Sequence, residues 1–145
     1  MKTTPSIFRF AAVVLFALFC TVSEAAPPAD IQALFQTINR ENVNYPSRAD
    51  DLDTLNRWYK DGDFDLVRSK AKDIIEQQRN VKAIKAGKTP ADIQALFQTI
   101  NRENVNYPSR ADDLDTLNRW YKDGDFDLVR SKAKDIIKQQ RNVNR

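Results

Sequence analysis

The chain contains no histidine, and among its 145 residues there is one cysteine, Cys20. Without histidine, Ser-His and Cys-His nucleophilic sites and the usual zinc ligands are excluded. Cys20 lies in an N-terminal segment that we predict to be removed, so the remaining chain would have no disulfide. Small exported domains usually support a thin core with disulfides, and this chain must rely on packing instead. We expect no enzyme, no cofactor and no metal site.

Runs of basic residues and N-glycosylation sequons are missing as well. The full chain has 23 Lys and Arg and 20 Asp and Glu; the first 25 residues hold Lys2, Arg9 and Glu24, which leaves 21 and 19. Acidic and basic residues alternate in short intervals, so no stretch follows a phosphate backbone. We therefore expect no nucleic-acid partner. A membrane-lytic helix is also disfavoured, because such helices carry a strongly basic face.

The N-terminal segment has the three-part form of a secretory signal peptide. Residues 1–9 carry Lys2 and Arg9, residues 10–22 form an apolar run broken by one threonine, and Ser23 and Ala25 are small residues at the −3 and −1 positions. The apolar run has 13 residues, whereas a membrane-spanning helix needs about 20. We predict that residues 1–25 are a signal peptide cleaved between Ala25 and Ala26; an uncleaved anchor is the alternative. The product would be extracellular, with no membrane span.

The rest of the chain is one stretch written twice. Residues 90–143 repeat residues 28–81 at an offset of 62, and the single difference is Glu76, which becomes Lys138. A repeat of this kind determines the architecture before any other pattern does. We predict a tandem duplication: a module at residues 26–81, a joint at residues 82–89 and a second module at residues 90–145.

Each module is predicted to form three helices. Ile31, Leu34, Phe35 and Ile38 recur at helical spacing, which predicts a first helix over residues 29–39. A second amphipathic helix is expected from Ser47 to a stop at Gly62, and a third after a short turn, so that the two form an antiparallel hairpin. In the first copy, the third helix is expected to continue to about Ala86. The predicted fold class is all-α, with about six helices.

Helix ends are predicted from capping residues. Thr89 before Pro90 reads as an N-cap for the first helix of the second copy, whereas the first copy has Pro27 there and should start less firmly. Ser47 with Asp50 reads as a capping box, and Asp63 as the cap of the third helix. Asp50, Asp51 and Asp53 are interpreted as solvated acids of a first helical turn.

The segment at residues 59–65, Tyr-Lys-Asp-Gly-Asp-Phe-Asp, resembles the turn between the two helices of a tetratricopeptide repeat. The likeness covers seven residues. Leu55 and Val67 stand where that family has small residues, and the 62-residue period differs from its 34. The resemblance therefore implies only a tight helix turn.

Carboxylates are the remaining candidate metal ligands. Asp61, Asp63 and Asp65 alternate as in a calcium loop. That loop needs glycine at its sixth position and glutamate at its twelfth, where this chain has Leu66 and Lys72. We interpret these acids as turn and cap residues.

Trp58 and Tyr59, with Trp120 and Tyr121 in the second copy, are candidate partner-binding residues, because exposed aromatic side chains dominate many interfaces. The alternative is that the tryptophan packs inward and the tyrosine lies at the rim of the core.

Gly87 before Lys88 is either the stop of a helix or a processing site, at which an enzyme would leave an amide on Ala86.

The function predicted from the sequence is that of a secreted, disulfide-free helical protein that binds another macromolecule, an extracellular protein or receptor, through two near-identical modules. Host defence, venom, saliva and reproductive fluid are fitting settings. One alternative is a two-copy precursor of hormone-like or defence peptides cleaved near Lys88. Another is a carrier that holds a small apolar ligand between the copies. Self-association, or pairing of the copies as a pseudo-dimer, is also left open.

Overall fold

The computed structural model describes residues 26–143, which form six helices and no strand. The all-α prediction is confirmed for this part of the chain. The predicted signal peptide, with Cys20 and the cleavage site at Ala25, lies outside the described residues, as do residues 144–145. The helices are α1 (Ala29–Glu41), α2 (Arg48–Asp61), α3 (Phe64–Lys85), α4 (Ala91–Glu103), α5 (Arg110–Asp123) and α6 (Phe126–Val143).

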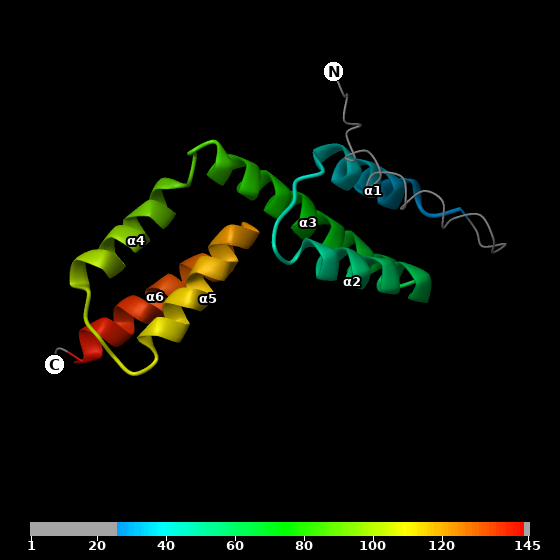
Figure 1. Ribbon diagram of the computed structural model, residues 1–145. Coiled ribbons are helices and arrows are strands. Elements are labelled where there is room, and N and C mark those ends of the chain that lie inside the picture. The colour runs from blue at the N-terminus through cyan, green and yellow to red at the C-terminus, as the bar shows by residue number, and fades with distance from the viewer. Residues whose placement is uncertain (1–25, 144–145) are drawn as a thin grey trace, which may run out of the picture.

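One long helix organises each half of the molecule. In the first half α1 and α2 both pack against α3, and in the second half α4 and α5 both pack against α6 (Figure 1). The apolar faces that the sequence predicts meet along these contacts. Ile31, Leu55 and Ile74 come from three different helices and are almost fully buried in one core, and Ile93, Leu117 and Ile136 do the same in the other.

The first helix of each half is two residues longer than predicted. α1 ends at Glu41, where Asn42 takes a left-handed conformation at φ 42° and donates its N–H to the carbonyl of Ile38. Asparagine tolerates this conformation better than most residues, so it can stop a helix as glycine does. Gly62 and Gly124 end α2 and α5 in the same conformation, as predicted.

Ser47 and Asp63 stand at the N-cap positions of α2 and α3, as predicted, but most of the predicted side-chain capping bonds are absent. α4 begins at Ala91 with no side-chain cap, and Thr89 instead shares a hydrogen bond with the hydroxyl of Tyr121 at 2.5 Å. α1 begins at the equivalent residue, Ala29, also without a side-chain cap, so the two helices start alike. Neither Ser47 nor Asp63 makes a capping bond. Asp125 does cap α6, because its Oδ1 accepts from the N–H of Leu128 at 3.1 Å.

The third helix of the first half extends into the joint, as predicted. α3 ends at Lys85. The N–H of Gly87 then donates to Ile84, and that of Lys88 donates to Ala83 at 2.8 Å. These two bonds with a left-handed glycine form a Schellman motif, which ends a helix and reverses the chain. The chain between α3 and α4 is therefore short.

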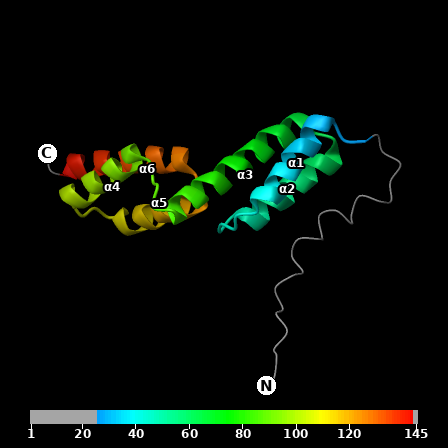
Figure 2. The same ribbon diagram turned by 90° about the horizontal axis from the view of Figure 1, so that it is seen from above.

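The two halves lie end to end, and the molecule is elongated (Figure 2). α3 extends beyond α1 and α2, and its C-terminal part contacts the second half near α5. Ile84 near the end of α3 packs against the core of the second half. The contact between the halves is therefore made by different surfaces on each side, and it is not the symmetric pairing of a pseudo-dimer.

Candidate binding surfaces

Asp51 anchors the loop between α1 and α2 to α3, contrary to its interpretation as a solvated acid. Its side chain is buried and accepts from the Tyr45 hydroxyl at 3.1 Å and from the Ser47 hydroxyl at 3.3 Å. Lys70 on α3 forms an ion pair with it at 2.5 Å. Asp50 and Asp53 are exposed, as predicted. A carboxylate at this position thus neutralises the lysine and satisfies two hydroxyl groups.

The same network recurs in the second half around Asp113. Tyr107 donates to Asp113 at 3.0 Å, and Lys132 pairs with it at 2.5 Å. Burial, with the hydrogen bond and the charge of Asp113, raises the pKa of the Tyr107 hydroxyl to about 12. Burial raises the pKa of Tyr45 further, and the charges of Asp51 and Asp123 contribute. The networks are alike, but the first one also faces the second half.

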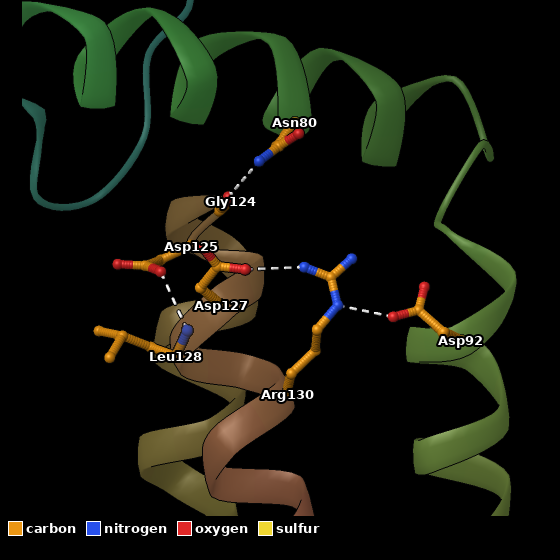
Figure 3. A network of polar contacts seen from close by, with 7 residues as sticks. All are labelled: Asn80, Asp92, Gly124, Asp125, Asp127, Leu128 and Arg130. Carbon is orange, nitrogen blue, oxygen red and sulfur yellow. Dashed lines mark hydrogen bonds and ion pairs between the residues drawn. The ribbon is translucent and has the colours of Figure 1, made fainter.

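Arginine side chains join the first and third helices of each half. Arg68 on α3 bonds Asp30 at 2.5 Å and Asp65 at 2.9 Å. In the second half Arg130 reaches across from α6 to Asp92 on α4 at 2.6 Å and to Asp127 at 2.9 Å (Figure 3). These arginines hold the start of one helix against the start of another and are partly exposed.

Acid is expected to destabilise the fold through these carboxylates. Hydrogen bonds from Arg68, Arg130 and Lys132 lower the pKa of Asp30, Asp92 and Asp113 below the ordinary value of 3.8. A carboxyl group with a lowered folded-state pKa adds stability above its unfolded pKa and loses it as the pH falls through the folded one. The thermal midpoint should therefore be steady near neutrality and fall below about pH 4.

Two lysines on α6, Lys132 and Lys134, provide the test variant and its control for this prediction. Lys132→Gln removes the partner of Asp113, whereas Lys134 is exposed. Lys132→Gln should lower the neutral-pH melting temperature and weaken its dependence on acid. Lys134→Gln should follow the wild type at every pH. Equal behaviour of the two variants would contradict a role for the partly buried pair of Lys132 and Asp113.

Tyr121 lies in an open groove between α4 and α5. The groove has a volume of about 450 Å³, and its lining residues are Thr89, Gln94, Phe97, Gln98, Asn118 and Tyr121. The rings of Phe97 and Tyr121 meet edge to face with centroids 5.2 Å apart, and Phe126 lies 6.2 Å from Tyr121. Half-buried aromatic rings here stand among amide and hydroxyl groups, a mixture found where one protein binds another.

The four predicted aromatic residues divide into two kinds. Tyr121 lines the groove, and the ring of Tyr59 in the first half lies 5.5 Å from that of Phe35, tilted by 60°. Trp58 and Trp120 are partly buried and pack against the two cores. Neighbouring residues of a helix point about 100° apart, so tryptophan and tyrosine serve different faces. All four contact their own core, and Tyr121 is the one that lines a groove.

A second groove lies between α1 and α3. It has a volume of about 490 Å³, and its lining residues are Leu34, Thr37, Lys72, Ile75, Glu76, Arg79 and Asn80. Glu76 is the position at which the two copies differ, and Lys138 stands there in the second half. The charged residues that line this groove are therefore both acidic and basic in the first half, whereas the equivalent residues of the second half are all basic. Neither groove lies between the halves, where a carrier would hold its ligand.

The predicted processing site is accessible. Ala86, Gly87 and Lys88 are all exposed in the turn that follows α3. The Schellman motif accounts for Gly87 as a helix stop. The geometry is thus compatible with either interpretation of this glycine.

One surface that could not be predicted from the sequence forms only when the halves meet. The turn at residues 123–125 rests on α3, where Asn80 Nδ2 donates to the Gly124 carbonyl at 2.8 Å (Figure 3). The backbone N–H of Ser47 donates to Asp123 Oδ1 at 3.0 Å. Asp123 is only 6% exposed there, and Val81 only 4%. No sequence signal could have found it, because the same residues occur in both copies.

Within residues 26–143 no helix is both long and apolar enough to span a membrane. The same residues contain no cluster of three or more potential metal ligands. Comparison with family models, with curated proteins and with solved structures finds no match to this chain. Proposals about function therefore rest on its own sequence and geometry.

Proposed function

We propose that this protein is secreted after removal of residues 1–25, and that its duplicated three-helix module binds an extracellular protein or receptor through two near-equivalent surfaces. The form of the N-terminal segment supports export. A fold with two small helical cores and open surface grooves favours binding over catalysis. Host defence, venom, saliva and reproductive fluid remain fitting settings.

The observation that carries this proposal is the aromatic groove between α4 and α5. Its floor holds Phe97 and Tyr121, and its rim holds exposed Gln98 and Asn118. Five of its six lining residues recur in the first half at an offset of 62, and the exception is Thr89, which is replaced by Pro27. The first half therefore offers nearly the same set of side chains, so that a partner of this groove would find a second site there, and two linked sites gain affinity through the tether.

Export is tested separately from binding. Expression of the full sequence in secretory cells should release a product whose N-terminal residue is Ala26. N-terminal sequencing and mass measurement of the medium check this. A product that stays in the membrane with residues 1–25 attached would contradict secretion.

Binding is tested by blocking the two grooves without touching the cores. Asn118→Arg places a long charged side chain at the rim of the groove, and Asn56→Arg places one at the equivalent position of the first half. Ser69→Arg with Ser131→Arg introduces the same charge at exposed positions outside the groove lining. A partner captured from the surrounding extracellular fluid should bind the control like the wild type. It should bind the groove variant about tenfold or more weakly, as expected for a blocked contact centre. Equal binding by both variants would exclude the grooves.

A second candidate function is a precursor of two peptides, and the exposed turn of Ala86, Gly87 and Lys88 favours it. Cleavage there would release two chains of about half the mature mass. Intact-mass analysis of the secreted material distinguishes the two functions, because a binding protein gives one species and a precursor gives two.

A further inference from the structure

Each half of the molecule carries two surfaces that are complementary to each other. Within the chain, one surface of each kind is in contact with the other half, and one of each kind is free. We call residues 61–63 and 123–125 the turn surfaces. The receiving surface of the first half consists of Ser47, Gln77, Asn80 and Val81, and that of the second half of Ser109, Gln139, Asn142 and Val143. Within the chain, the second turn surface docks on the first receiving surface. Among residues 26–143, the first turn surface and the second receiving surface have no such contact.

The burial of equivalent residues shows the difference. Gly124 is buried and Val81 is 4% exposed in the docked pair, whereas Gly62 is exposed and Val143 is 55% exposed. A Cβ on Gly124 would lie 2.7 Å from the backbone oxygen of Gln77, but a Cβ on Gly62 would have no atom within 4 Å. The free surfaces are identical in sequence to the docked ones.

We infer that the free turn surface of one chain docks on the free receiving surface of a second copy, with the hydrogen bonds already present within the chain. Asn142 of one copy would donate to the Gly62 carbonyl of the next, and the Ser109 N–H would donate to Asp61. This contact is heterologous, because each side contributes a different patch. A dimer therefore leaves one free surface of each kind, and continued addition gives a ring or a filament.

The single difference between the copies favours this contact. The turn surface is acidic because it contains Asp61 and Asp63. The next helix begins one residue further on. Glu76 lies one helical turn before Asn80 on α3, and Lys138 lies one turn before Asn142 on α6. The free receiving surface therefore has the basic Lys138 beside it, whereas the occupied one has the acidic Glu76. Opposite charges attract across such a contact, and salt weakens the attraction.

The contact between chains should be weaker than the contact within one. The joint holds the two halves of a chain close together and raises their effective concentration, which separate chains lack. Ile84 also packs on the second core within the chain, and it has no counterpart among the described residues of the second half. We therefore expect association that is reversible and rises with protein concentration.

Two variants test the inference by removing one surface each. Gly62→Ala adds a Cβ to the free turn surface, at the position where the equivalent docked residue, Gly124, has no room for one. Val143→Arg places a charge on the free receiving surface. Sedimentation velocity of the full chain over a concentration series should show association of the wild type and none of either variant. Ser69→Arg is the exposed control and should associate normally. Circular dichroism checks that all variants keep wild-type helicity.

Mixing the variants gives the decisive result. The Gly62→Ala chain keeps its receiving surface, and the Val143→Arg chain keeps its turn surface. An equimolar mixture should form dimers and nothing larger, although each chain alone is monomeric. A wild type that stays monomeric at the highest soluble concentration would overturn the inference. Association that survives in both variants, as exchange of helices would, overturns it equally.

Discussion

Gly124→Ala is expected to separate the two halves of the chain in dilute solution, and Gly62→Ala is expected to leave them docked. Both glycines are left-handed, at φ 75° and 76°, so both alanines carry the same local strain of about 1–2 kcal/mol. Only the Cβ at position 124 meets other atoms, with Gln77 O at 2.7 Å and Val81 Cγ2 at 2.9 Å. Overpacking of this kind costs about 1–3 kcal/mol more.

Small-angle scattering measures the separation directly. The radius of gyration should increase for Gly124→Ala and stay at the wild-type value for Gly62→Ala, with equal helicity by circular dichroism. The amide signal of Ser47 in nuclear magnetic resonance should shift in the first variant alone, because its hydrogen bond to Asp123 is lost. If both variants keep the docked arrangement of the wild type, the turn is not what holds the halves together.

Ile136→Ala is expected to unfold the second half at a much lower temperature than the first, and Ile74→Ala the reverse. Both side chains are fully buried, and truncation of a buried isoleucine to alanine costs about 2–5 kcal/mol. A half of about sixty residues has a total stability of roughly 3–9 kcal/mol. One truncation therefore removes a large share of it, and there is no disulfide among the described residues to compensate.

Tryptophan fluorescence can follow each half separately, because Trp58 belongs to the first core and Trp120 to the second. In a Trp58→Phe background the signal reports the second half, and in a Trp120→Phe background it reports the first. Ile136→Ala should shift the midpoint of Trp120 more than that of Trp58. A single common shift in both backgrounds would mean that the halves unfold as one unit.

Much of the fold could be predicted because it depends on local spacing. The periodic apolar residues of α1, such as Ile31 and Ile38, define one face, and that face is buried. Gly62 fixes the end of α2 because few other residues adopt its conformation easily. These features depend only on residues that lie within one or two helical turns of each other in the sequence.

Polar side chains were harder to predict because their partners are distant in sequence. Asp51 was interpreted as a solvated acid, but Lys70, 19 positions later, draws it into a partly buried ion pair. Thr89 was interpreted as a cap, but Tyr121, 32 positions later, takes its hydroxyl. Each short polar side chain has a local and a distant choice of hydrogen bond, and packing decides between them.

The sequence alone determined that the described chain consists of six amphipathic helices, since spacing and helix stops are local properties written in each copy. It did not determine how the copies differ, because residues 61–63 and 123–125 are identical. Only the tertiary structure decided that one of these turns is buried and the other exposed. The physical reason is the short joint after α3, which brings the second turn against Asn80 and Val81, whereas a Cβ at Gly62 in the first turn would meet no atom within 4 Å.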